Sequence, residues 1–255
     1  MVETKDMKNV RHVIERAIKA RGQIVAVVGP AGTGKTTAVE HALERDDLKV
    51  IWVVPMSDTA KESLRIRHIV SAMLAELGLP INLPRYLRNR RLAMRLRELG
   101  KKVVVVIDDA HMLHPNTLRA LKQLQEGVRV GPYKRLFTIV VIGLPELARK
   151  IAAYWELEGR VWKVKMEGLS EAEISEYVAS FGGKLFTQDG IKQLAALPQK
   201  DFLLIQKIVQ IAMSKSNAIG PLGAAEVAEL AGLVLHSDIK PVVTHMQRRK
   251  IAARR

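Results

Sequence analysis

The sequence predicts an α/β fold, in which a five-stranded parallel sheet carries a phosphate-binding loop and is followed by a small all-helical lid. Three observations lead to this prediction. The apolar run at residues 24–28 breaks into a glycine-rich segment, after which helical periodicity resumes. Short β-branched runs then alternate with helical patterns up to about residue 166, as they do in parallel sheets. From Ser170 onward only helical periodicity is present.

The length and charge of the chain limit the classes of protein to which it can belong. Its 255 residues, 48% of them hydrophobic, suffice for one nucleotide-binding domain and a small accessory domain. The formal net charge of +15 favours a polyanionic partner, and duplex DNA is the partner we expect. No apolar run reaches the roughly 20 residues that span a bilayer, and residues 1–10 lack the apolar core of a signal peptide. With no cysteine in the chain, these features predict a cytoplasmic protein without a membrane partner.

The glycine-rich segment reads G-x-x-x-x-G-K-T and predicts a site for ATP and Mg²⁺. In such a loop the backbone N–H groups turn toward the phosphates, and the following helix points its positive end at them. Lys35 is expected to reach the β- and γ-phosphates, and the Thr36 hydroxyl to hold Mg²⁺. The residues predicted to contact the nucleotide are Gly29, Pro30, Ala31, Gly32, Thr33, Gly34, Lys35, Thr36 and Thr37.

A second part of this site is expected after the third strand. The β-branched run at residues 103–107 ends in Asp108 and Asp109, which a central parallel strand would deliver to the phosphate edge of the sheet. Asp108 is expected to bind Mg²⁺, directly or through water. Asp109 is expected to orient or deprotonate the attacking water.

The remaining elements follow from periodicity and from glycine and proline punctuation. Helices are predicted at residues 4–20, 36–44, 61–77, 115–126 and 146–153, strands at 50–54, 137–142 and 161–166, a loop at 127–135, and lid helices from 170 and at about 187–196, 201–214 and 223–234. The domains expected from this order are an N-terminal helix at 1–22, the core at 23–167, the lid at 168–235 and a basic tail at 236–255.

Two further segments remain open to alternatives. A cationic stretch at residues 81–102, opposed only by Glu98, predicts either a solvated helix face or proximity to nucleic acid. The aromatic residues Tyr154, Trp155 and Trp162 are expected in the core, with a subunit interface as the second interpretation.

The order of these motifs resembles the AAA+ ATPases over nearly the whole chain. Four segments, V-V-G-P-A-G-T-G-K-T-T, D-D-A-H, I-G-L-P-E-L and E-L-E-G-R, are similar to the small ATPases of DNA transposition. That group includes phage Mu transposition protein B and the TniB and TnsC regulators, and the secretion ATPases of the ExeA type are near relatives.

The resemblance implies an ATPase that assembles on duplex DNA as a helical filament or ring and regulates a transposase. It places Lys35, Asp109 and Arg160 in catalysis, with Arg160 reaching the γ-phosphate of a neighbouring subunit. It implies that the helices after the second strand face the DNA. The expected DNA-binding residues are Lys61, Arg65, Arg67, Arg85, Arg88, Arg90 and Arg91.

Two residues depart from the family pattern. Asp109 stands where these ATPases usually carry glutamate, and Leu144 stands where a polar residue often touches the γ-phosphate. The shorter carboxylate suggests slow hydrolysis. Two alternative functions therefore stay open: a nucleotide-gated scaffold with very slow turnover, and a secretion or signalling ATPase of the ExeA type that acts on protein partners.

Overall fold

The structure is a computed structural model, and it describes residues 3–20, 22–53, 65–99, 101–130, 134–180, 185–197 and 202–235. The chain divides into two compact units, which are described separately. The sheet unit comprises Lys5–Gly29 and Lys35–Met166. The helical unit comprises Met1–Thr4, Pro30–Gly34 and Glu167–Arg255. The four-part domain division expected from the sequence stays a prediction.

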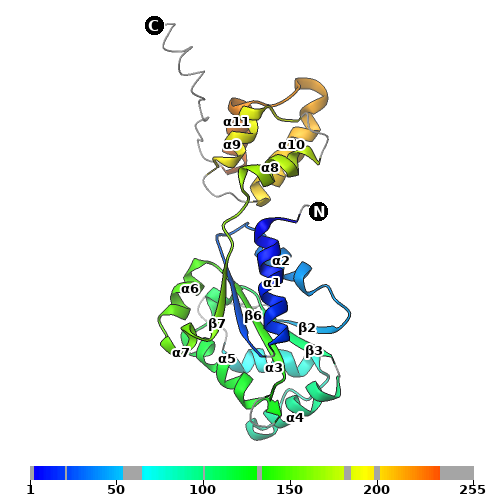
Figure 1. Ribbon diagram of the computed structural model, residues 1–255, viewed down its shortest axis with the longest axis vertical. Helices are drawn as coiled ribbons and strands as arrows, with labels where there is room; N and C mark the ends of the chain where they lie inside the picture. The colour runs from blue at the N-terminus through cyan, green and yellow to red at the C-terminus, as the bar shows by residue number, and fades with distance from the viewer. Residues whose placement is uncertain are drawn as a thin grey trace. The chain divides into compact units, whose positions relative to one another are not determined.

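The sheet unit contains the predicted five-stranded parallel sheet, which confirms the fold class (Figure 1). Its order is β2-β3-β6-β1-β7, so the loop-bearing strand β1 lies between β6 and β7. Strands β1 and β6 are buried throughout, as expected for central strands covered on both faces. The strands are β1 (Ile24–Val28), β2 (Leu48–Val53), β3 (Lys102–Ile107), β6 (Phe137–Gly143) and β7 (Val161–Lys165).

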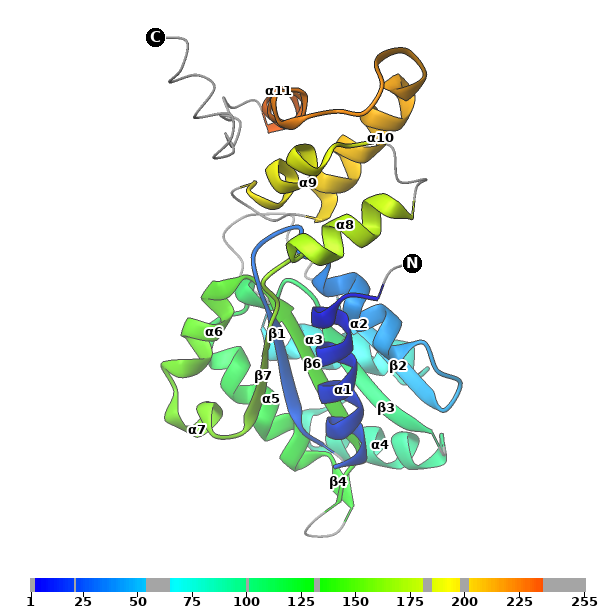
Figure 2. The ribbon, with the colours of Figure 1, turned by 45° about the horizontal axis from the view of Figure 1, so that its top comes forward.

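Alternate residues of each strand pack into two different cores, because successive side chains point to opposite faces of a sheet. Val25 and Val27 join α1 and α2 on one face, whereas Ala26 joins α3, α4, α5 and α6 on the other. Both ribbon views show α1 and α2 together on one face (Figures 1 and 2). The helices are α1 (Lys5–Lys19), α2 (Lys35–Leu43), α3 (Ile66–Glu76), α4 (Arg85–Glu98), α5 (Pro115–Gly127), α6 (Pro145–Ala152) and α7 (Trp155–Glu158).

Three of the sequence expectations differ from the described structure or fall partly outside it. The predicted loop at 127–135 contains a short antiparallel hairpin, β4 (Arg129–Val130) with β5 (Lys134–Arg135). The helix expected from residue 61 is seen from Ile66, and residues 54–64 lie outside the described residues. The core prediction is wrong for Trp155, which is 86% exposed.

The helical unit has its own apolar core. It is built from α8 (Glu171–Ala179), α9 (Gln188–Ala195), α10 (Phe202–Ile219) and α11 (Ala224–Leu235). The predicted capping box is present, since Ser170 accepts from the backbone N–H of Glu173 and its own N–H donates to the Glu173 carboxylate. Within the same unit the first N–H of α10, on Phe202, donates to the carbonyl of Gly32 at 3.1 Å. None of the described helices is long and apolar enough to cross a membrane.

Candidate functional site

The carboxyl edge of the sheet brings together the ends of β1, β3 and β6. All three strands run parallel, so the segments that follow them leave at the same edge. The glycine-rich loop follows β1, the acidic pair follows β3, and Gly143 ends β6. The N–H of Gly29 donates to the carbonyl of Gly143 at 3.3 Å and ties the start of the loop to the neighbouring strand.

The loop has the backbone that its sequence predicts. Gly32 and Gly34 have φ angles of 73° and 78°, which side-chain-bearing residues rarely adopt. A Cβ built on Gly34 would meet no described atom within 4 Å, so its positive φ and not a close contact favours glycine at this position. Thr33 is buried and donates from its hydroxyl to the carbonyl of Pro30 at 3.0 Å. This bond fixes the turn within the loop.

Thr36 and Asp108 form the contact that joins the loop to β3. The Thr36 hydroxyl donates to Oδ2 of Asp108 at 3.0 Å, and Oδ1 of Asp108 accepts from the N–H of Asp109 at 2.8 Å. A hydroxyl and one carboxylate suit Mg²⁺, which usually takes one or two carboxylates and completes its shell with water and phosphate oxygens. No cluster of three or more potential ligands among His, Cys, Asp and Glu occurs in the described part of the chain.

Asp109 stands in a strained conformation. Its φ of 45° and ψ of 34° are left-handed, and it is the one non-glycine residue with positive φ among the described residues. The side chain is 66% exposed, and Oδ1 lies 3.9 Å from Nδ1 of His111. That His111 nitrogen is buried and makes no hydrogen bond with any described group. Such strain often accompanies a functional position.

The segment after Asp109 is anchored by a residue that the sequence did not single out. Residues 110–112 form a 3₁₀ turn, η1 (Ala110–Met112). Lys150 on α6 donates to the carbonyls of His111 and Leu113, the second at 3.1 Å. A Cβ on Gly143 would lie 3.0 Å from the backbone nitrogen of His111, so the glycine permits this close approach. Lys150 and Gly143 therefore hold the acidic segment against the end of β6.

Arg160 lies at the opposite edge of the sheet. It directly precedes β7, so it is at the amino edge, whereas Asp108 and Asp109 follow β3 at the carboxyl edge. Its Nη1 lies 3.6 Å from Oε1 of Glu126 on α5, and these side chains are 55% and 40% exposed. Arg160 therefore does not reach the acidic pair of its own chain.

The basic residues expected to meet DNA separate into two groups. A cavity of about 330 Å³ between α3, α4 and α5 is lined by Arg67, Arg88, Asn89 and Gln123. Nε of Arg88 is buried without a described hydrogen-bond partner, and Arg67 bonds its neighbour His68. We call these residues the three-helix groove.

The other expected DNA-binding residues lie elsewhere. Arg65 is exposed at the start of α3, where its backbone N–H donates to His68. Arg90 and Arg91 are exposed on α4 and do not line the groove. Lys61 and the side chain of Arg85 fall outside what the structure describes.

Comparison with known proteins gives one family and a set of solved structures. The family described as the AAA domain matches residues 18–151. The fold is similar to the ORC2 protein of Aeropyrum pernix in ADPNP–ADP complexes, with a TM-score of 0.67 at 12% identity over 94% of this chain and 69% of that chain. For Cdc6p of Pyrobaculum aerophilum the TM-score is 0.63 at 15% identity, over 89% of this chain and 65% of that one.

A third similar structure is that of the ORC1 protein of A. pernix in complex with DNA, with a TM-score of 0.57 and 15% identity. It is matched over 90% of this chain and 64% of its own length. The sequence matches none of the curated proteins with which it was compared. At these identities the likeness to solved structures shows a shared fold.

Proposed function

Because the chain belongs to the AAA domain family, we propose that it is an ATPase that assembles on duplex DNA and regulates a transposase. The observation that carries the nucleotide part is the 3.0 Å contact between the Thr36 hydroxyl and the Asp108 carboxylate. This contact joins the loop motif to the acidic segment after β3, and a nucleotide with its Mg²⁺ requires both. Lys35, the first residue of α2, is the cation for the β- and γ-phosphates.

In this proposal the acidic segment activates water. Asp109 would orient or deprotonate the attacking water, and Lys150 would position its segment. When bound, ATP would supply the γ-phosphoryl group, and Mg²⁺ held by Thr36 and Asp108 would neutralise the charge that develops on it. Asp109 also favours the second candidate function, a nucleotide-gated scaffold with very slow turnover. Its carboxylate is short, exposed and held in a left-handed backbone.

Assembly would complete the site with Arg160 of a neighbouring protomer. Arg160 is at the amino edge of its own sheet, so it can serve a γ-phosphate only in trans. An exposed ion pair contributes about 1 kcal/mol or less, so release from Glu126 requires little free energy. Trp155, five residues before Arg160, is exposed, and aromatic residues are enriched at interfaces. Its exposure therefore supports a subunit interface near Arg160.

The three-helix groove is the DNA contact that the described residues support best. Of the described residues that line it, two are arginines and none is acidic. The buried, unpaired Nε of Arg88 is a donor that a phosphate oxygen would satisfy. In an oligomer this weak site would repeat along the backbone and give tight, sequence-tolerant binding.

The transposase partner is the most specific element of the proposal. Its only support is the resemblance of four sequence segments to the ATPases of DNA transposition. The solved structures of similar fold are named as ORC and Cdc6 proteins, one of them in complex with DNA. A secretion or signalling role of the ExeA type would act on protein. The charge of +15 argues for DNA instead.

One experiment tests ATPase activity and assembly together. The ATPase rate per protomer is measured at rising protein concentration, with and without duplex DNA, while electron microscopy follows assembly. We expect a rate that increases with concentration, and oligomers that form on DNA when ATP is present. Assembly without measurable turnover would support the scaffold. The absence of both turnover and assembly would refute the proposal.

A further inference from the structure

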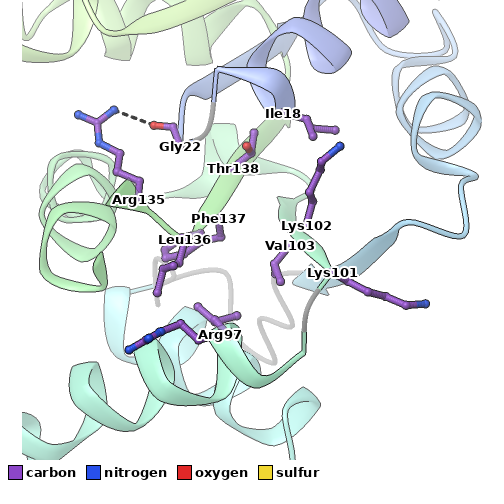
Figure 3. Close-up of a pocket in the computed structure, with 11 residues that line it drawn as sticks. Ile18, Gly22, Arg97, Lys101, Lys102, Val103, Arg135, Leu136, Phe137 and Thr138 are labelled. Carbon is purple, nitrogen blue, oxygen red and sulfur yellow. Dashed lines mark hydrogen bonds between the residues drawn. The ribbon is translucent and has the colours of Figure 1, made fainter. Parts of the chain in front are cut away.

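A second cavity lies at the amino edge of the sheet, at the opposite end of β3 from Asp108 (Figure 3). Its volume is about 360 Å³, and its lining includes the first residues of β3 and β6. All of its lining residues belong to the sheet unit. The six residues of β3, at about 3.3 Å each, separate this edge from Asp108 by roughly 20 Å. A ligand here would occupy a site distinct from the nucleotide site.

Among the described residues that line this basic cavity, four are cationic and none is acidic. The four are Arg97 on α4, Lys101 just before β3, Lys102 at the first position of β3, and Arg135 on β5. Figure 3 shows Arg97 on one side and Lys102 and Arg135 on the other, while Lys101 points away from them. Cations from three separate segments therefore gather at one cavity.

Nearby partners neutralise only part of this charge. Nζ of Lys102 lies 3.3 Å from Oδ2 of Asp47, whose carboxylate also accepts two hydrogen bonds from Arg45 at 2.9 Å. The bond from Arg45 is the main reason that the pKa of Asp47 lies below its ordinary value. Asp47 is therefore shared between two cations. Arg135 donates to the carbonyl of Gly22 at 2.7 Å, a partner without formal charge.

A structural explanation for the cations is that they stabilise helix ends. The last turns of α1 and α4 reach this cavity, and a helix C-terminus carries about half a negative charge. The three cations other than Lys101, less about half a charge for the shared Asp47 and about one for the two helix ends, leave between roughly one and two positive charges. Helix capping therefore accounts for only part of the cluster, and the remaining charge suits a phosphate group.

We propose that the basic cavity binds a terminal phosphate, the dianionic phosphomonoester group of a free mononucleotide or of a 5′ DNA end. A terminal phosphate carries nearly two charges above its second pKa of about 6. A phosphate inside a DNA strand carries one charge and has a sugar on both sides, so it offers these cations two free oxygens instead of three. Arginine and lysine on opposite sides would bind the phosphate oxygens through charge-assisted hydrogen bonds.

The test uses the Lys35→Ala protein, in which the phosphate loop no longer supports nucleotide binding. Calorimetry at pH 7.5 measures the binding of adenosine 5′-monophosphate, and fluorescence anisotropy compares a 5′-phosphorylated oligonucleotide with the same strand ending in a 5′-hydroxyl. In this background Arg97→Gln with Lys102→Gln should weaken binding of at least one phosphate probe by about tenfold or more. Both side chains are exposed, so the fold should be retained, and thermal unfolding checks this.

The matched control is Lys8→Gln with Arg149→Gln, which removes two exposed positive charges of the sheet unit that line neither cavity. It should leave phosphate affinity within about twofold of the Lys35→Ala parent. If only the affinity for adenosine 5′-monophosphate falls, the ligand is a free mononucleotide. If only the affinity for the 5′-phosphorylated strand falls, the ligand is a 5′ DNA end. Equal weakening by the control pair, or no binding of either phosphate probe to the parent, would overturn the proposal. The proposed ATPase function is unaffected by either result.

Discussion

Thr36 and Asp108 are 72 residues apart in the sequence, yet the hydroxyl of one donates to the carboxylate of the other at 3.0 Å. Their strands are not neighbours, because β6 lies between β1 and β3. The contact therefore depends on the whole centre of the sheet. It brings the hydroxyl of the loop motif and the carboxylate of the acidic motif within hydrogen-bond distance of each other.

Thr36→Val should remove the dependence of nucleotide affinity on Mg²⁺. Valine keeps the branched shape but has no hydroxyl, so a metal ligand and the bond to Asp108 are both lost. We expect the gain in affinity on adding Mg²⁺ to fall by about tenfold or more, and Thr36→Ser to keep most of it. Titrations in Mg²⁺ and in EDTA measure this. An unchanged Mg²⁺ effect in the valine variant would argue against Thr36 as a ligand.

Asp109→Asn should preserve nucleotide binding and abolish hydrolysis, leaving the protein trapped on DNA. The amide keeps the shape of the side chain but cannot accept a proton from water. Asn and Gly both tolerate the φ of 45°, so Asp109→Gly is the control for the backbone, and its unfolding free energy should stay within about 1 kcal/mol of wild type. Wild-type turnover in Asp109→Asn would exclude Asp109 as the catalytic base.

The sequence predicted the parts of this protein that depend on local pattern. The loop at Gly29–Thr36, the strand β3 that precedes Asp108 and the four lid helices each have their own periodicity or motif. The hairpin β4–β5 was missed because strands of two residues are too short to show alternation. Helix α10 extends to Ile219, past the predicted residue 214, because apolar spacing marks the buried part of a helix better than its end.

Contacts between distant segments that belong to no recognised motif could not be predicted. The pairing of Arg160 with Glu126, the bonds from Lys150 to the turn after Asp109 and the basic cavity all join segments that periodicity treats separately. The prediction of a core position for Trp155 is wrong because aromatic residues are enriched both in cores and at interfaces, so residue type does not distinguish the two. Only tertiary structure separates these two environments.

Arg160→Ala should reduce the ATPase rate and oligomer growth while leaving nucleotide affinity of the protomer unchanged. The reason is that Arg160 would act on the site of a neighbour. Glu126→Ala is the matched control, because it breaks the same exposed ion pair and should retain hydrolysis and unfold within about 1 kcal/mol of wild type. ATPase rates across protein concentrations test this. Equal loss in both variants would show that the ion pair itself matters.

Arg67→Gln with Arg88→Gln should flatten the salt dependence of DNA binding more than Arg90→Gln with Arg91→Gln. Each phosphate contact adds about 0.9 to the slope of log affinity against log salt, so losing two lowers it by about 1.8. Anisotropy titrations of duplex DNA with ATP, at several salt concentrations, give these slopes. The reverse ranking would place the DNA contact on the exposed face of α4, and no change from either pair would indicate a solvated face.

Nucleotide binding at the phosphate loop is the central claim, and a titration of the Lys35→Ala variant with a fluorescent ATP analogue tests it most directly. The substitution removes the cation assigned to the β- and γ-phosphates and leaves Thr36 and Asp108 in place. Lys19→Ala, on the exposed side of α1, serves as the control. We predict saturable binding by wild type and by the control, and loss of binding by Lys35→Ala. Wild-type affinity in Lys35→Ala would contradict the assignment of the site.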